Sequence, residues 1–331
     1  MHFIKYLVGR LIAWLIVIFV GVTFMFFIPR FFPADPVEGM IQQMLQLQGA
    51  MDAHAIDSMR EALELQFGLQ GSLWEQYVRF LTNVVRLDFG PSLSAFPAPA
   101  SELVLRFLPY TVFLSVFTLI ISWITGNLIG MVSGFRKDHT GSKILEWLAI
   151  YLYPIPFVIA ALAVQVLFSF ILGWFPVTAD IITTGGPAVF LDSLIRASIL
   201  PSITMVLLGL GWWAISMRAM AQNTAEDDFV RYARFRGIPE WQIGTRYVFR
   251  NSILPQVSGL SVALGGVFSG AIIVEIIFQY PGVGRLAMTA IQRADFNLIM
   301  ATATISIVAV ATATLIADLI YPFIDPRIRY R

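Results

Sequence analysis

The residues of this chain that could take part in chemistry gather in one polar stretch, 218–256, between two apolar segments. The stretch combines several arginines with aromatic residues that recur every three positions, which is the spacing of one helix face. The aromatic residues are Phe229, Tyr232 and Phe235, and the arginines are Arg231, Arg234, Arg236, Arg246 and Arg250. Aromatic side chains edged with charge suit a short helix that enters a groove of a soluble partner. The stretch therefore predicts a docking element.

No other set of residues predicts catalysis or metal binding. The chain has no cysteine, which excludes disulfides, thiolate ligands and cysteine nucleophiles. His2, His54 and His139 are scattered, and no pair has the i, i+4 spacing of a zinc-binding helix. The stretch GLGWWA (209–214) lies inside an apolar run and not after a strand, so it is no dinucleotide-binding loop. GSK (141–143) lacks the order and spacing of a P-loop. We expect no catalytic residue, no metal site and no bound cofactor, so any energy source must be external.

Composition predicts the class of protein. Hydrophobic residues make up 57% of the chain, charged residues 13%, and the mean hydropathy is +0.75. A soluble core does not need so much apolar surface, so the bilayer must be the solvent. The net charge of +1 argues against a nucleic-acid partner, which would require a strong basic excess. The sequence predicts an all-α polytopic membrane protein.

Apolar runs of roughly twenty residues, the length that crosses a bilayer, predict six transmembrane helices. The runs lie at 11–31, 109–134, 144–172, 196–217, 257–279 and 298–322. The first run is longer than the apolar core of a typical signal peptide, and no small-residue cleavage site follows it. We therefore expect a retained anchor.

The distribution of positive charge predicts that both termini are cytoplasmic. Lys and Arg gather in the segments that this orientation places inside, at 5–10, 136–143, 218–250 and 327–331. The organisation expected is an N-terminal tail with span 1 (1–32), an external loop (33–106) and a transmembrane core (107–331) that carries the cytoplasmic loop 218–256. Helical spacing at 53–65 and at Trp74, Tyr77 and Phe80 predicts a helical external loop, which either shields the span ends or receives a partner.

Small residues and prolines mark the predicted spans. Glycines that repeat every four residues allow two helices to approach closely, which favours packing over a role in the transport pathway. They are Gly126, Gly130 and Gly134 in the second run, and Gly266 and Gly270 in the fifth. Pro154 and Pro156 predict a break in the third run, either as a static kink or as a moving segment.

Two acidic residues lie within the predicted spans, near their ends. Glu275 is followed by a turn with Pro281, Gly282 and Gly284, and either supports that turn or takes part in a gate. Asp318 has arginines close in sequence, which favours a structural role. These two residues make a poor proton or sodium site, which argues against a secondary transporter. A membrane-embedded enzyme would need a catalytic cluster, and the sequence has none.

The stretch DFVRYARFRGI (228–238), closing with Arg250, Asn251, Leu254 and Pro255, resembles the cytoplasmic loop of permease subunits of ABC importers, in the dipeptide and oligopeptide branch. Further matches extend over nearly the whole chain. They are PADP (33–36), FGL (67–69), QY (76–77), DFGPS (88–92), IPF (155–157), EIIFQYPGVG (275–284), ADLIY (317–321) and DPRIRY (325–330). Ala34 departs from the glycine usual in the branch, and the loop 39–55 is longer than expected.

The resemblance implies the type I importer fold in the inner membrane, working by alternating access. The implied partners are a second permease, two ATPase subunits that carry ATP and Mg, and an extracytoplasmic solute-binding protein. The implied ATPase-coupling helix covers about 226–236 and ends at Gly237; its residues are Asp228, Phe229, Arg231, Tyr232, Ala233, Arg234, Phe235 and Arg236. For the substrate, oligopeptide is favoured over oligosaccharide, because aromatic belts explain the 14% aromatic content as well as sugar stacking does.

Overall fold

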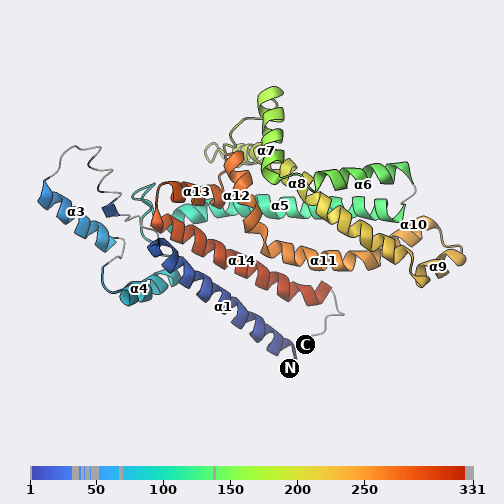
Figure 1. The fold of residues 1–331 in the computed structure, drawn as a ribbon, viewed down its shortest axis with the longest axis horizontal. Helices are drawn as coiled ribbons and strands as arrows, with labels where there is room; N and C mark the ends of the chain where they lie inside the picture. The colour runs from blue at the N-terminus through green and yellow to red at the C-terminus, as the bar shows by residue number, and fades with distance from the viewer. Residues whose placement is uncertain are drawn as a thin grey trace. The chain divides into compact units, whose positions relative to one another are not determined.

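The computed structural model describes residues 2–31, 37–38, 41, 45, 52–66, 70–136 and 139–324 (Figure 1). Over these ranges the regular structure is helical, apart from one isolated bridge between Pro91 and Pro99. The chain divides into two compact units. The first comprises 1–10, 110–281 and 313–331, and the second comprises 11–109 and 282–312.

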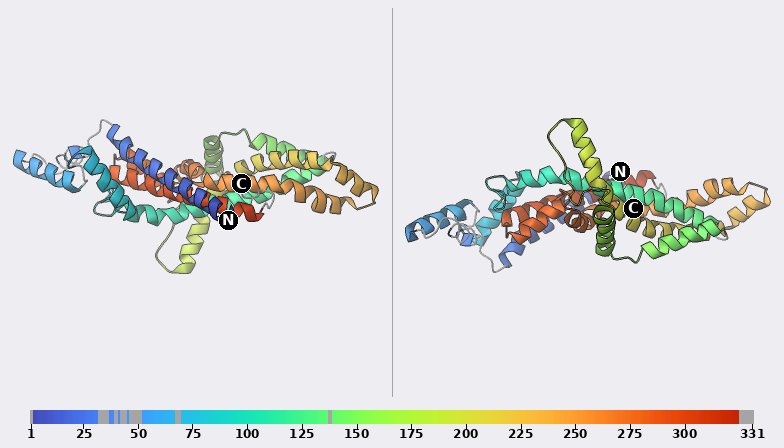
Figure 2. Two further views of the ribbon diagram at one scale, coloured as in Figure 1. Left: turned by 90° about the horizontal axis from the view of Figure 1, so that it is seen from below. Right: turned by 90° about the horizontal axis from the view of Figure 1, so that it is seen from above.

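The first unit is organised around α8, which contacts α6, α7 and α11 (Figure 2). Besides the part of α5 that begins at Tyr110, it contains α6 (Thr140–Leu152), α7 (Phe157–Gln165), η1 (Val166–Ile171), α8 (Pro187–Ala225), α9 (Asp228–Phe235), α10 (Glu240–Gln242), η2 (Ile243–Phe249), α11 (Arg250–Gly265) and α12 (Val267–Ile277). The π-helical turns η1 and η2 extend α7 and α10. Side-chain hydrogen bonds join α8 to α11, from Ser252 Oγ to Thr224 Oγ1 at 3.1 Å and from Gln256 Nε2 to Ser216 Oγ at 2.8 Å.

The second unit has its own core. It contains most of α1 (His2–Phe31), α3 (Ala53–Gln66), α4 (Leu73–Val85), the start of α5 (Ala100–Phe135), α13 (Val283–Gln292) and the start of α14 (Phe296–Ile324). Its largest cluster of buried residues comprises Phe89, Ala100, Val104, Val283, Ala290, Leu298, Ala301 and Ile305. The helices α3 and α4 are those predicted for the loop 33–106, whereas α13 lies between the predicted runs 257–279 and 298–322.

Among the described residues, four helices are long and apolar enough to cross a membrane: Lys5–Ile28 of α1, α5, α8 and Phe296–Ile320 of α14. A fifth crossing is possible where α6 pairs with α7 and η1, because the two segments are bent by 104°. This bend confirms the break predicted at Pro154 and Pro156, since α6 ends at Leu152 and Pro156 caps α7. The predicted run 257–279 is interrupted at Gly266, between α11 and α12. The count of six spans therefore stays a prediction.

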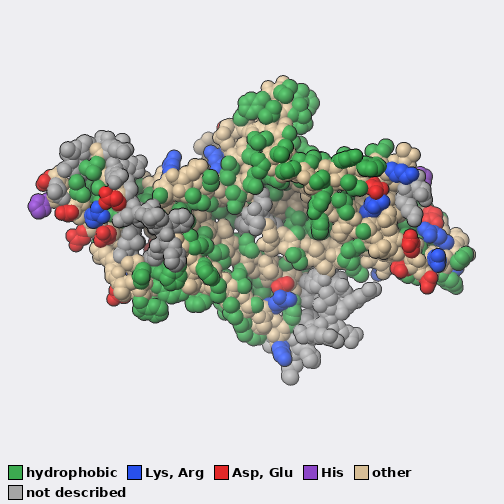
Figure 3. All heavy atoms as spheres, viewed as in Figure 1, with side chains coloured by type: hydrophobic (Ala, Val, Ile, Leu, Met, Phe, Trp, Pro, Cys, Tyr) green, Lys and Arg blue, Asp and Glu red, His purple; other side chains and the backbone are tan. Residues whose placement is uncertain are grey.

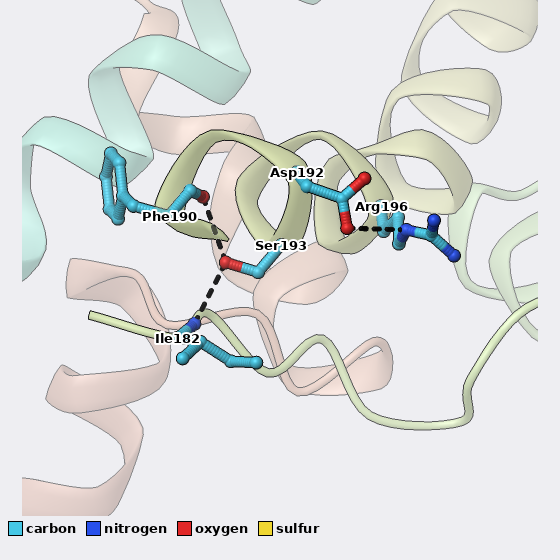
Figure 4. Close-up of polar contacts among 5 residues, drawn as sticks. All are labelled: Ile182, Phe190, Asp192, Ser193 and Arg196. Carbon is cyan, nitrogen blue, oxygen red and sulfur yellow. Dashed lines mark hydrogen bonds and ion pairs between the residues drawn. The ribbon is translucent and has the colours of Figure 1, made fainter. Parts of the chain in front are cut away.

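The helix α8 begins earlier than the predicted run 196–217. Its first turns are tied to the preceding loop by Ser193, whose Oγ accepts from the Ile182 amide at 3.0 Å and donates to the Phe190 carbonyl at 2.9 Å (Figure 4). On the same turns Arg196 Nε lies 2.9 Å from Asp192 Oδ2 (Figure 4). The helix therefore begins before its apolar run, in turns that carry these polar contacts.

Several sequence matches lie outside the described residues. They are the segments 33–36, 67–69 and 325–330. Most of the loop 39–55, which departs from the family pattern, also lies outside the described residues.

Candidate docking surface around α9

One narrow face of α9 attaches this helix to the rest of the first unit. Val230 and Ala233, three residues apart, are 0% and 2% exposed. They pack in a cluster of buried residues from α5, α8 and η2, namely Met131, Met217, Ala221, Ile243 and Val248. Figure 1 shows α9 at the end of α8, next to α10. The predicted helix is therefore present, although it begins two residues later and ends one residue earlier than 226–236.

The aromatic residues of α9 lie on its exposed surface. The exposed fractions of Phe229, Tyr232 and Phe235 are 42%, 64% and 89%. A large apolar side chain that is almost fully exposed contributes little to the stability of its own chain, so this surface has no evident role in folding. The sequence singled out these three aromatics and Ala233, but Val230 was missed. Its i, i+3 relation to Ala233 is the signal that could have found the attached face.

Charged side chains surround the aromatic surface (Figure 3). Arg234 Nε lies 3.0 Å from Glu240 Oε1, and Arg231 Nη1 lies 4.0 Å from Asp228 Oδ1. The guanidinium of Arg236 lies over the ring of Tyr232, 6.0 Å from its centroid. These side chains are largely exposed, and exposed ion pairs typically contribute only ~0–1 kcal/mol. A partner could therefore reorganise them at low cost.

Gly237 ends α9 in the left-handed conformation, with φ 72°. Its amide donates to the Arg234 carbonyl at 2.9 Å, and the Ile238 amide donates to the Ala233 carbonyl at 3.2 Å. Such paired bonds satisfy the last carbonyls of a helix and favour glycine at the turning position. The glycine fixes the direction in which the chain leaves toward α10.

Glu275 on α12 is fully buried, with an exposed fraction of 0%. Its Oε1 accepts a hydrogen bond from Thr111 Oγ1 on α5 at 2.6 Å. Glu275 therefore pairs with a neighbouring helix. Its position near the end of an apolar run does not by itself show how the neighbouring helices cover it. Of the turn residues, Pro281 ends the segment 110–281 of the first unit. Gly282 caps α13 and Gly284 lies in its first turn, both in the second unit.

The glycines of the second predicted run lie against α8. A Cβ atom at Gly126 would lie 2.6 Å from Trp213 Cβ, and one at Gly134 would lie 2.6 Å from the Arg218 carbonyl oxygen. At Gly130 it would meet the Ala214 carbonyl oxygen. Gly266 differs, because its one near neighbour is the Ala263 carbonyl oxygen at 3.6 Å. Gly270 lies within α12, outside the described side chains.

Asp318 on α14 has a described partner in the first unit. Its Oδ2 lies 3.0 Å from Arg10 Nη1, and its carbonyl accepts from the Tyr6 hydroxyl at 2.8 Å. The arginines that the sequence placed near it, Arg327 and Arg329, lie outside the described residues. Within the described part of the chain, no three His, Asp or Glu side chains come together as a metal site.

Comparison with known proteins places these features in a family. Residues 126–330 match the binding-protein-dependent transport system inner membrane component family. The glutathione transport system permease protein GsiC of Escherichia coli (strain K12) is 27% identical over 329 residues, which are 99% of this chain and 100% of the relative. The oligopeptide transport system permease protein AppB of Bacillus subtilis (strain 168) is 29% identical over 314 residues, which are 95% and 96% of the two chains. The chain is thus a multi-pass membrane protein that belongs to the family of binding-protein-dependent transport system inner membrane components.

Proposed function

We propose that this chain is the permease subunit of an ATP-driven importer and that ATPase subunits dock on α9. The observation that carries the proposal is the division of α9 into two faces. Val230 and Ala233 attach the helix to its own chain, while Phe229, Tyr232 and Phe235 stay exposed. Exposed aromatics beside arginines are the residue types that dominate binding energy at protein interfaces.

The attachment of α9 suits it to transmit movement. Its buried face contacts side chains of α5, α8 and η2, and hydrogen bonds tie α8 to α11. A displacement of α9 by ATP-driven closure of the ATPases would therefore shift several helices together. In this proposal the shift alternates a pathway, shared with a second permease, between outward-open and inward-open states.

The substrate that we propose is a small peptide. Both relatives carry peptides by name, one glutathione and the other oligopeptides. A solute-binding protein would deliver the peptide on the outer side of the inner membrane, and both termini of this chain would lie in the cytoplasm. The aromatic content, the one feature that suits an oligosaccharide, is explained equally well by aromatic belts.

Within the permease we propose structural roles for the buried polar and small residues. Glu275 would fix α12 to α5 through Thr111, while Gly126, Gly130 and Gly134 would bring α5 close to α8. A gate at Glu275 and the turn Pro281, Gly282 and Gly284 remains the second hypothesis for that residue. The gate requires transport to change in a Glu275→Gln variant that keeps its thermal stability.

The proposal is tested by affinity purification of the tagged chain from its native membrane, with mass spectrometry of the proteins that accompany it. Recovery of ATPases, a sister permease and a solute-binding protein is expected, and the ligand of that binding protein would identify the substrate. An Arg231→Glu variant should lose the ATPases at moderate salt, whereas Lys143→Glu on α6 should retain them. Recovery of the unmodified chain alone, in detergent that preserves a known importer, would overturn the proposal.

A further inference from the structure

We propose that α4 is an amphipathic helix that lies on the bilayer, with one stripe of side chains in contact with the acyl-chain boundary of the lipid. The stripe consists of Trp74, Val78 and Val85, whose exposed fractions are 70%, 45% and 86%. The partner of this stripe is the phospholipid bilayer, at the boundary between the headgroups and the acyl chains.

Only part of the apolar face of α4 packs against other residues of the protein. Tyr77, Phe80 and Val84 are partly buried and form the packed side of the helix. At 3.6 residues per turn, Trp74, Val78 and Val85 fall within about 40° of one another, next to that packed side. The helix therefore has a continuous apolar face, of which one half packs on the rest of the second unit and the other half is exposed.

The opposite face of α4 is polar. Glu75, Arg79, Thr82 and Arg86 fall within about 60° of one another, on the side of the helix away from Tyr77. All four are exposed. Arginines on the polar side and Trp and Val on the apolar side are typical of helices that lie in the membrane interface, where the arginines attract lipid phosphates.

The contacts of α4 with α1 place it at the depth of the headgroups. Tyr77 donates to or accepts from Thr23 Oγ1 at 2.8 Å, and its ring packs at 5.2 Å from Phe26 and at 6.1 Å from Phe27. These residues of α1 lie in the last two turns of the candidate span Lys5–Ile28. Figure 1 shows α4 beside that end of α1. A span end marks the boundary between hydrocarbon and headgroups, whichever side of the membrane it faces.

The exposed stripe is continuous with the lipid-facing surface of α1. Phe24 and Phe27 are 63% and 40% exposed near the end of that span. From Phe27 a row of rings leads onto α4, through Tyr77 to Trp74, whose centroid lies 5.8 Å from that of Tyr77. Trp and Tyr are enriched where spans meet the headgroups, because their rings are apolar and their N–H and O–H groups are polar. Lipid that surrounds α1 would thus also contact the stripe on α4.

The absence of native cysteine makes a direct test possible in the full-length chain. Single cysteines at Val78 and Val85 report on the stripe, and matched cysteines at Arg79 and Thr82 report on the polar side. Each variant is spin-labelled, purified with the subunits that accompany it and reconstituted in phospholipid nanodiscs. Collision rates with oxygen, which enters lipid, and with a water-soluble nickel complex are then measured by electron paramagnetic resonance.

We expect a several-fold higher ratio of oxygen to nickel collisions at 78 and 85 than at 79 and 82. Equally low ratios at all four positions would show that water surrounds the helix, which would overturn the proposal. Low collision rates with both reagents at 78 and 85 would show a protein partner on the stripe and would overturn it as well. Variants are compared only where elution volume and helical content match those of the unmodified chain, so that a misfolded label site is excluded.

Discussion

Ser92 donates a hydrogen bond from Oγ to Oδ2 of Asp295 over 2.6 Å, although the two residues lie 203 positions apart in the sequence. The same carboxylate oxygen accepts from the amide of Ser94 at 2.9 Å and from its hydroxyl at 2.6 Å. The other oxygen accepts from the Leu298 amide at 3.1 Å, at the start of α14. Asp295 is fully buried, so it joins the segment after α4 to the junction between α13 and α14 inside the second unit.

Replacement of Asp295 should therefore be costly. Asp295→Ala would remove the acceptor of the buried Ser92 hydroxyl and Leu298 amide and of the partly buried Ser94. We expect a loss of about 3 kcal/mol in the free energy of unfolding. The matched control is Asp192→Ala on α8, whose ion pair with Arg196 is exposed and should contribute under about 1 kcal/mol. Thermal unfolding of both variants in detergent measures the difference. Equal melting temperatures would contradict a stabilising role for the Asp295 contacts.

Close packing of α5 on α8 predicts a second stability effect. Gly130→Ala would place a Cβ atom against the Ala214 carbonyl oxygen and 2.8 Å from Met217 Cβ, so the helices must separate. Overpacking of this kind costs about 1–3 kcal/mol. Gly141→Ala on α6 is the control, because a Cβ atom there meets nothing within 4 Å. A Gly130→Ala chain as heat-stable as the Gly141→Ala chain would show that the two helices adjust without strain.

Patterns among neighbouring residues predicted the elements whose formation depends on those same residues. Pro154 and Pro156 predicted the break between α6 and α7, and the aromatic spacing in 228–238 predicted α9. Features that arise from distant contacts could not be predicted in this way. The burial of Glu275 depends on Thr111, 164 positions earlier, and the Asp295 contacts depend on serines near position 92. Neither acid has a local pattern that shows which residues cover it.

The interruption between α11 and α12 is another feature that the sequence did not predict. An unbroken apolar run at 257–279 predicted one span, yet the helix is interrupted at Gly266. Glycine weakens a helix only modestly, so a single glycine does not show whether packing will preserve or break it. The proline break was predictable because proline removes a backbone donor whatever its surroundings.

The exposed aromatics of α9 predict a variant that separates docking from folding. Phe235→Ala should leave the melting temperature nearly unchanged, because Phe235 is 89% exposed. If the ring is an anchor for the ATPase, its loss should weaken association about tenfold or more. Val230→Ala is the comparison, because it removes buried contacts and should lower the melting temperature. Binding is measured by co-purification with the ATPases over a range of salt. Unchanged retention of the ATPases by Phe235→Ala would remove this ring from the docking surface.

Gly237 predicts a change in transport without a change in membrane insertion. Proline cannot adopt φ 72°, so Gly237→Pro should redirect the chain after α9 while every candidate span stays intact. Asparagine tolerates the left-handed conformation and provides the control. We expect substrate uptake to be lost in Gly237→Pro and largely kept in Gly237→Asn, with equal amounts of both chains in the membrane. Normal uptake by the proline variant would show that the position of α9 does not matter for coupling.

The start of α4 should loosen at acidic pH. Ser72 and Glu75 form a reciprocal cap: the Ser72 amide donates to Glu75 Oε2 at 2.7 Å, and the Glu75 amide donates to Ser72 Oγ at 3.3 Å. The bond from the Ser72 amide, followed by the Ser72 hydroxyl and the charge of Arg79, lowers the pKa of Glu75 below its usual 4.5. A lowered pKa means that the cap stabilises the helix above about pH 4.5 and that this contribution is lost as the pH falls through the lower, folded-state pKa.

Spin-label mobility at Leu73→Cys should therefore rise below that pH, while mobility at Val85→Cys stays constant. Glu75→Gln keeps the acceptor oxygen but does not titrate, so mobility at position 73 that still rises in this background would assign the change to another group.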